Sequence, residues 1–240
     1  MSLLGNWLAA KNVAQSVVDG PVLAKLNQWR DLPEADLSGP LDRQRWLVVD
    51  VETTGLDMHR DQLLAIGAVV VEGRLIQLDQ SFEVVLRQDA PSREANILIH
   101  RIAGGEQVDG IEPAEALASF LEFAQKLPCV AFHAAFDETM LRRACRGHLG
   151  IDFSPQFVDL AHLAPALFPE APSALRSLDD WVAYFSIGIH ARHRAVADAL
   201  GTAQLFQALL ARATERNIAS AQKLFSMARD QRWLAGLAGR

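Results

Sequence analysis

Two acids end an apolar run in the first quarter of the chain. Residues 46–56 read WLVVDVETTGL, so Asp50 and Glu52 are two positions apart. In an extended strand, residues i and i+2 point to the same face, so both carboxylates project together from the end of a buried strand. Burying two like charges is costly unless a cation or a proton compensates them. The pair predicts a divalent cation site, to which other segments must add ligands.

Two further aspartates lie on the apolar stripes of predicted helices. Apolar residues follow Asp137 at i+3, i+4, i+7 and i+8, and the inward stripe after Asp198 takes i+4, i+7 and i+11. Because charge is normally excluded from such stripes, both aspartates are expected to face inward. Two other interpretations stay open here. Asp137 could cap its helix, and Asp198 could pair with Arg192 or Arg194.

Four inward carboxylates require one shared explanation. Oxygen-only ligands suit Mg²⁺ or Mn²⁺, and four carboxylates suit two ions, with Asp50 as the candidate bridging ligand. Two ions about 3.5–4 Å apart are the usual apparatus for in-line displacement at phosphorus. His193 lies five residues before Asp198, off the helical face, so we expect it on the preceding loop. An imidazole there can take a proton from the attacking water, although a single such histidine is more often an ordinary loop residue.

Together, three motifs resemble those of the DEDDh family of 3′–5′ exonucleases, which includes the proofreading (epsilon-type) subunit of bacterial DNA polymerase III. The motifs are residues 50–55 (DVETTG), 133–137 (HAAFD) and 193–198 (HRAVAD), and the resemblance covers residues 46 to about 213. An isolated Asp-x-Glu motif is weak evidence for this family. The order and spacing of all three motifs make the resemblance specific.

This resemblance implies a fold, a ligand set and a substrate pocket. The implied fold is α/β and ribonuclease-H-like, with a five-stranded mixed sheet flanked by helices. Asp50, Glu52, Asp137 and Asp198 would bind two Mg²⁺ or Mn²⁺ ions, and His193 would be the general base. The chain departs from the family pattern at Ala134, where asparagine is common, and at Arg101, where glycine is usual. The implied substrate-binding residues are Thr53, Thr54, Gly55, Leu56, His100 and Phe136.

The implied activity is release of nucleoside 5′-monophosphates from the 3′ end of single-stranded nucleic acid, with DNA favoured over RNA. An exoribonuclease acting on short RNA is one alternative. A partner-recruiting nucleic-acid-binding module, in which the N-terminal helices dominate function, is another. A protein partner would then bind through residues 1–40.

The pattern of the elements must position these residues. We expect an N-terminal helical extension and linker over 1–44, an exonuclease domain over 45–214 and a packed C-terminal helix over 215–240. The extension should hold two helices broken at Gly20-Pro21. The expected strands and helices of the remainder are Trp46–Val51, Leu63–Val71, Leu75–Leu86, an apolar segment Ile97–Ile102 before a Gly104-Gly105 turn, a helix from Pro113 to Pro128, strand Cys129–Phe132, helix Ala134–His148, strand-like Phe157-Val158, and helices Ala174–Phe185, Ala195–Ala213 and Ile218–Leu237.

Composition limits the function classes. The 240 residues are 50% hydrophobic and can bury a real core, while a net charge of -6 argues against broad coating of duplex DNA. Cys129 and Cys145 lie in apolar surroundings without metal-ligand spacing, so buried free thiols in a reducing compartment are expected. Neither a membrane-spanning stretch nor a signal sequence is apparent, so we expect a cytoplasmic protein without membrane contact.

Overall fold

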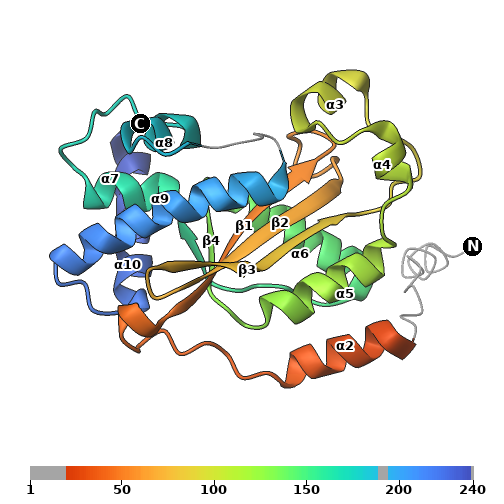
Figure 1. Cartoon of the computed structure of the whole chain (residues 1–240), viewed down its shortest axis with the longest axis horizontal. Coiled ribbons are helices and arrows are strands. Elements are labelled where there is room, and N and C mark those ends of the chain that lie inside the picture. The colour runs from red at the N-terminus through yellow and green to blue at the C-terminus, as the bar shows by residue number, and fades with distance from the viewer. Residues whose placement is uncertain (1–19, 189–193, 239–240) are drawn as a thin grey trace, which may run out of the picture.

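The computed structural model describes residues 20–188 and 194–238. Its centre is one five-stranded sheet in the order β3-β2-β1-β4-β5 (Figure 1). β1 pairs antiparallel with β2 and parallel with β4, so the sheet is mixed and helices cover both faces. The expected architecture is therefore confirmed. The strands are β1 (Arg45–Thr53), β2 (Leu63–Glu72), β3 (Leu75–Val85), β4 (Cys129–Ala131) and β5 (Phe157–Asp159).

The helices occupy the connections between these strands and the two ends of the described chain. They are α2 (Gly20–Asp31), the short 3-10 helix η1 (Leu41–Arg43), α3 (Glu94–His100), α4 (Gly104–Val108), α5 (Pro113–Ala124), α6 (Ala135–Leu149), α7 (Leu160–Leu167), α8 (Leu178–Tyr184), α9 (Ala195–Glu215) and α10 (Ala221–Ala238). Among these helices, none combines the length and the apolar character that crossing a membrane requires.

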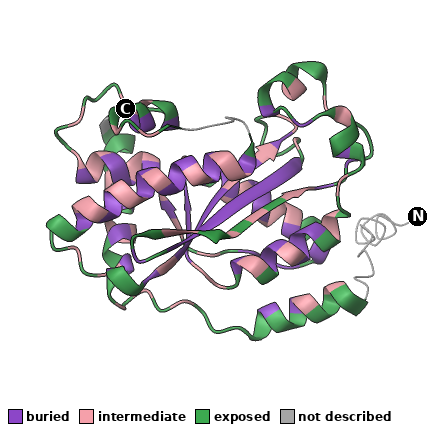
Figure 2. Ribbon diagram, viewed as in Figure 1, coloured by how far each residue is buried: buried purple, intermediate pink, exposed green. Residues whose placement is uncertain are grey.

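β1 is buried on both faces, and its residues alternate between two cores. Leu47, Val49 and Val51 pack with α5 and α6, whereas Trp46 and Val48 pack with α7 and α9. Figure 2 shows the buried strands between these helix layers. The even-numbered residues face α9, so this alternation sends the next two of them, Asp50 and Glu52, toward the start of α9.

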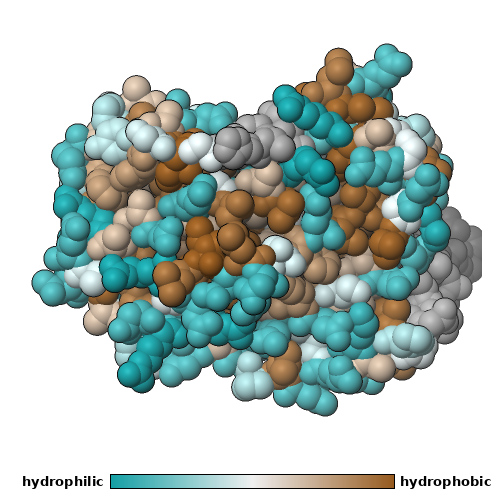
Figure 3. Space-filling view, viewed as in Figure 1, coloured by the Kyte–Doolittle hydropathy of each residue, from teal (hydrophilic) through white to brown (hydrophobic). Residues whose placement is uncertain are grey.

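Two tryptophans and both cysteines lie in the core. Trp46 and Trp181 are 0% and 2% exposed. Both cysteines are buried free thiols, which confirms the expectation from the sequence. On the sheet edge, by contrast, Leu75 and Leu78 of β3 are each 67% exposed, and Figure 3 shows apolar side chains among polar ones on the face that carries β3 and α9.

The connection after β3 differs from the expectation. The predicted turn at Gly104-Gly105 is the first turn of α4, and the predicted apolar segment 97–102 is the end of α3 and its exit. α3 ends because Arg101 adopts a left-handed backbone with φ 57°. Glycine adopts this conformation without a steric cost, which explains why a glycine would fit the position of Arg101.

The region between β5 and α9 contains a helix that the pattern did not predict. α7 is apolar around most of its circumference and carries Pro165, so its helical period could not be recognised in the sequence. The helix expected over residues 174–185 begins only at Leu178. Ser177 and Asp180 form a capping box there, which fixes the start. Asp180 is thus part of the cap of α8.

α2 begins at the predicted break and packs on α5. The indole N–H of Trp29 donates to the carbonyl oxygen of Gln125 at 2.6 Å, and Lys25 pairs with Glu122 at 2.8 Å. Leu26 is 1% exposed within the same core as α5 and α6. The first predicted N-terminal helix lies outside the described residues, and α10 packs on α7 and β5. The division at residues 44 and 214 stays a prediction.

Candidate metal centre

Three carboxylates from β1 and α9 meet at the end of the sheet. Asp50, Glu52 and Asp198 each place one oxygen within 4.8 Å of the other two. Asp198 is 4% exposed, and the two acids of β1 are half-buried. Hard oxygen donors at this spacing fit a divalent cation such as Mg²⁺ or Mn²⁺. The structure therefore brings together three of the four acids that the sequence singled out.

The close approach of α9 to the sheet depends on Gly67. In the sheet register Gly67 lies opposite Asp50 on β1 and opposite Glu83 on β3. A Cβ at this glycine would lie 2.0 Å from the carbonyl carbon of Ala195 and 2.1 Å from the backbone nitrogen of Val196. Only glycine leaves room for the first turn of α9 there, and that turn carries Asp198. A lone glycine inside an apolar strand can mark such a close approach of another backbone, but the sequence analysis made no prediction from Gly67.

We predict that Gly67→Ala weakens cation binding by separating α9 from β1. The new methyl group must push the first turn of α9 outward, which should destabilise the fold by about 1–3 kcal/mol. Cation affinity should fall by roughly tenfold, because Asp198 moves away from Asp50 and a tenfold change is about 1.4 kcal/mol. Calorimetric titration with Mn²⁺ and thermal unfolding measure the two effects.

The matched control is Gly105→Ala in α4, where a Cβ would meet no atom within 4 Å. This variant should bind Mn²⁺ like the parent protein. Unchanged Mn²⁺ affinity in Gly67→Ala would show that the close approach is not needed for the site.

Asp137 lies next to this cluster on the first turn of α6. Its carboxylate accepts the backbone N–H of Val51 at 3.1 Å, and the residue is 6% exposed. The N-cap of α6 is Ala134, so the alternative interpretation of Asp137 as the N-cap is wrong. Burial raises the pKa of Asp137 to about 8, and the nearby charges of Asp159 and Glu52 add to the rise. The buried carboxyl group of Asp137 therefore ionises readily only when a cation binds beside it.

This raised pKa predicts a pH-dependent loss of stability in the cation-free protein. An unfolded aspartate has a pKa near 3.9, so between about pH 4 and pH 8 the folded state holds a proton that the unfolded state has lost. The contribution of Asp137 to the free energy of unfolding is therefore greatest below pH 4 and falls as the pH rises to 8. Asp137→Asn should remove this pH dependence. Relative to the parent, its free energy of unfolding should be higher by on the order of several kcal/mol at pH 8 and almost unchanged at pH 4.

Urea unfolding in EDTA at pH 4 and pH 8 measures this difference. Saturating Mn²⁺ should stabilise the parent protein more at pH 8, because the cation favours the ionised carboxyl group. Asp79→Asn, on the exposed surface of β3, is the matched control and should follow the parent. Equal pH dependence in Asp137→Asn and the parent would refute the assignment.

The loop after β1 is organised by Asp61. One oxygen of its carboxylate accepts the hydroxyl of Thr54 at 2.9 Å, and the other accepts the backbone N–H of Asp57 at 2.8 Å. A Cβ at Gly55 would lie 2.5 Å from this carboxylate, so a larger residue there would displace the Asp61 side chain. Thr53 donates its hydroxyl to the carbonyl oxygen of Gly55 at 2.6 Å. The hydroxyls of both threonines are thus engaged within the loop.

Two other predicted pocket residues lie in this loop and on α6. Leu56 is 86% exposed and presents an apolar side chain to solvent. Phe136 is half-buried on the first turn of α6, immediately before Asp137. Asn96 of α3 donates its amide N–H to the carbonyl oxygen of Thr54, which ties the α3–α4 segment to the loop. Nothing in the sequence pattern indicated this contact of Asn96.

His100 lies inside the α3–α4 segment rather than on its surface. The ring is 2% exposed, and Nδ1 accepts the backbone N–H of Ile102 at 3.1 Å. Nε2 therefore carries the proton of the neutral ring and donates to the hydroxyl of Ser92, 2.9 Å away. Burial lowers the pKa of His100, in agreement with a neutral ring. This geometry holds the segment together from within, and direct contact of His100 with substrate stays a prediction.

The predicted general base, His193, lies outside the described residues. In the sequence it precedes Ala195, the first residue of α9, by two positions. Arg194 pairs with Glu83 at 3.0 Å, so the guanidinium considered as a partner for Asp198 is engaged with β3 instead. Arg192, the other partner considered, is also outside the described residues.

Asp159 connects the end of β5 to the second motif. It caps α7 by accepting the N–H of Ala161 at 3.0 Å, and also accepts the backbone N–H of His133 at 3.0 Å. His133 is exposed and has a left-handed backbone with φ 61°. Asp159 therefore holds the turn that leads into α6 and Asp137, a role that its sequence context did not indicate.

Comparisons with known proteins agree on one family. A family model described as exonuclease matches residues 47–206. A PolC-type DNA polymerase III of Thermotoga maritima is 34% identical over 168 residues, which are 67% of this chain and 11% of that protein. The DNA polymerase III subunit epsilon of Treponema pallidum is 27% identical over 168 residues, which are 70% of this chain and 77% of that protein.

Among solved structures, exonuclease X in complex with 5′ overhanging duplex DNA matches with a TM-score of 0.58 and 19% identity. The match covers 76% of this chain and 99% of that one. At this identity the likeness shows the fold alone, and the expected ribonuclease-H-like fold is confirmed. The chain spans about a tenth of the length of the PolC-type relatives.

Proposed function

Because this chain belongs to the exonuclease family, we propose that it is a divalent-cation-dependent 3′–5′ exonuclease. It would release nucleoside 5′-monophosphates from the 3′ end of single-stranded nucleic acid. The observation that carries the proposal is the meeting of Asp50, Glu52 and Asp198 within 4.8 Å. This donor set suits the hydrolysis of a phosphodiester, whose charge increases in the transition state.

The acids would divide the work of holding cations. Asp50, Glu52 and Asp198 would bind one ion, and Asp137, beside Val51, would help to hold a second ion shared with Asp50. Bound Mg²⁺ or Mn²⁺ would supply Lewis-acid stabilisation of charge at the phosphorus centre. The raised pKa of Asp137 supports this division, since the second ion would favour its ionised form.

The remaining motif residues would bind and orient the 3′ end. Thr53, Thr54 and Gly55 form a loop whose internal hydrogen bonds fix its backbone, so it can hold the terminal nucleotide in one position. Leu56 would offer its exposed apolar side chain to a base, and Phe136 would add a half-buried ring from the first turn of α6. His193 would take the proton from the attacking water.

The names of the relatives favour DNA as the substrate. The protein of Treponema pallidum is a DNA polymerase III subunit, and exonuclease X was solved with DNA. A side-by-side digestion tests the assignment with 3′-labelled single-stranded DNA, duplex DNA, RNA and dinucleotides in Mg²⁺ or Mn²⁺. Cation-dependent release of mononucleotides from single-stranded DNA is expected. Faster digestion of short RNA would favour the exoribonuclease alternative, and no hydrolysis of any substrate would refute the proposed function.

A protein partner belongs to the same proposal, because the relatives named above are polymerase subunits or polymerases. Residues 1–40 are the candidate contact. Within this segment, Leu26 and Trp29 of α2 are buried against the domain, so they support the fold of α5 and α6. A partner would therefore use the exposed side of α2, which includes Leu23 at 43% exposure, together with the residues before it.

A further inference from the structure

A groove lined by arginines runs along α6 beside the candidate metal centre. Its volume is about 530 Å³, and its walls come from the loop after β1, from α6 and from α10. Four of its lining residues are arginines, and one is an acid, Glu138. The arginines are Arg142, Arg143 and Arg146 of α6 and Arg232 of α10.

The charge of this groove is opposite in sign to that of the chain. Arg142 bonds Asp152 at 2.7 and 2.8 Å, and Arg146 bonds the same carboxylate at 2.9 Å. Two guanidinium groups thus share one negative charge. Arg143 donates to the backbone carbonyl oxygens of Met58 and Asp61, which leave its positive charge in place. In a chain with a net charge of -6, such a concentration of positive charge attracts an anion to one place.

The groove is walled by two segments that also carry parts of the candidate site, α6 and the loop after β1. Ala135 and Glu138, which line the groove, flank Asp137 in sequence, and Met58 belongs to the loop that holds Gly55 and Leu56. From Ala135 to Arg146 the helix advances about 16 Å, at 1.5 Å per residue. This length accommodates several nucleotides of a strand whose 3′ end lies at the carboxylates.

We propose that this arginine groove binds the phosphates of the single strand several nucleotides upstream of the cleaved bond. The inference rests on the proposed exonuclease function, which supplies the polarity of the strand. Phosphates fit because guanidinium groups donate in pairs to them, and because a strand gives one negative charge per nucleotide. The groove would give a long strand more affinity than a short one, while Asp152 would limit that gain.

The test compares binding of a fluorescent 12-nucleotide single-stranded DNA with that of a trinucleotide, in EDTA, where cation-dependent hydrolysis cannot occur. In Arg142→Ala/Arg146→Ala, affinity for the 12-mer should fall by roughly tenfold, with trinucleotide binding unchanged. The slope of log affinity against log salt should fall by about 1.4, since each lost phosphate contact to a single strand removes about 0.7. Circular dichroism checks the fold, and Arg142→Lys/Arg146→Lys, which keeps both charges, should retain most of the salt slope.

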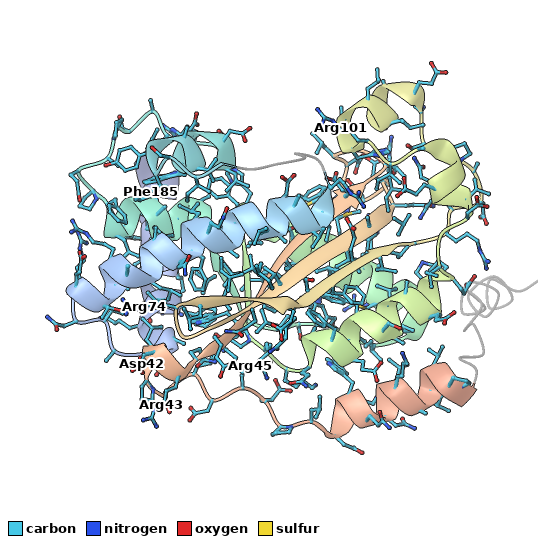
Figure 4. The ribbon with its side chains drawn as sticks, in the orientation of Figure 1. Asp42, Arg43, Arg45, Arg74, Arg101 and Phe185 are labelled. Carbon is cyan, nitrogen blue, oxygen red and sulfur yellow. The ribbon has the colours of Figure 1, made fainter. Side chains whose placement is uncertain are left out.

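Two further variants make the test specific. Asp152→Asn releases both guanidinium groups and should tighten 12-mer binding by about threefold, since one competing charge is lost. Arg43→Ala/Arg74→Ala is the matched control, because it removes the same charge from a different place. Arg43 lies just before β1 and Arg74 lies in the turn between β2 and β3. Figure 4 shows both at the end of the sheet opposite to the α3–α4 end, where Arg101 is labelled. This control should change 12-mer affinity by less than twofold.

The outcomes separate the groove from the enzyme activity. Equal 12-mer affinity in Arg142→Ala/Arg146→Ala and the parent would overturn the groove proposal. An equal loss in Arg43→Ala/Arg74→Ala would overturn it as a net-charge effect. Failure of the parent to hydrolyse any strand in Mg²⁺ or Mn²⁺ would refute the exonuclease function, whereas binding in EDTA still decides the groove.

Discussion

Asp50→Ala and Asp198→Ala are each expected to abolish cation-dependent release of mononucleotides, with a loss of roughly 10³-fold or more, on the scale of removing part of a catalytic metal site. Each substitution removes one of the three carboxylates that lie within 4.8 Å of one another. The two remaining carboxylates cannot hold a cation with the same affinity. Calorimetric titration with Mn²⁺ and chromatography of the released nucleotides measure the two losses.

The fold should survive both substitutions. Thermal unfolding in EDTA should show a stability close to that of the parent, because the two apolar cores on either side of β1 are untouched. Asp79→Ala, which removes an exposed carboxylate of β3, is the control and should keep full activity. Activity close to that of the parent in Asp50→Ala or Asp198→Ala would refute the proposed function.

His193→Ala is expected to lower turnover by roughly 10²–10⁴-fold, the usual scale for the loss of a general base. Cation affinity should change little, because the proposed cation ligands are the carboxylates of Asp50, Glu52 and Asp198. The acidic limb of the pH–rate profile should also flatten, since deprotonation of an imidazole near pH 6.5 would no longer control the rate.

His190→Ala is the matched control, since His190 lies three positions before His193 in the same segment. It should retain turnover and the parent pH profile. A parent-like turnover and pH profile in His193→Ala would mean that another group takes the proton.

Local sequence patterns determined much of the site because they depend only on backbone periodicity. The two-residue spacing of Asp50 and Glu52 puts both on one face of β1 in any extended strand. The apolar stripes after Asp137 and Asp198 turn both aspartates inward in any regular helix. The structure agrees, since both helical aspartates are buried and Asp198 joins the acids of β1.

Contacts between distant segments were decided only by the tertiary structure. Gly67 matters because the start of α9 lies against it, and no local pattern encodes that approach. The raised pKa of Asp137 arises from burial among several elements, and α7 is apolar on too many sides to reveal a period. Such effects depend on which surfaces the folded chain brings together.

The arginine groove illustrates the same division. Arg142, Arg143 and Arg146 lie on one helix, and nothing in their spacing along the sequence marks them as a binding site. Packing then sets them beside the loop at Met58 and beside Arg232 of α10, about 90 residues later. Periodicity along the chain thus determined which acids face the core. Packing across the chain decided how close those acids lie and what surrounds them, because both depend on contacts between residues far apart in sequence.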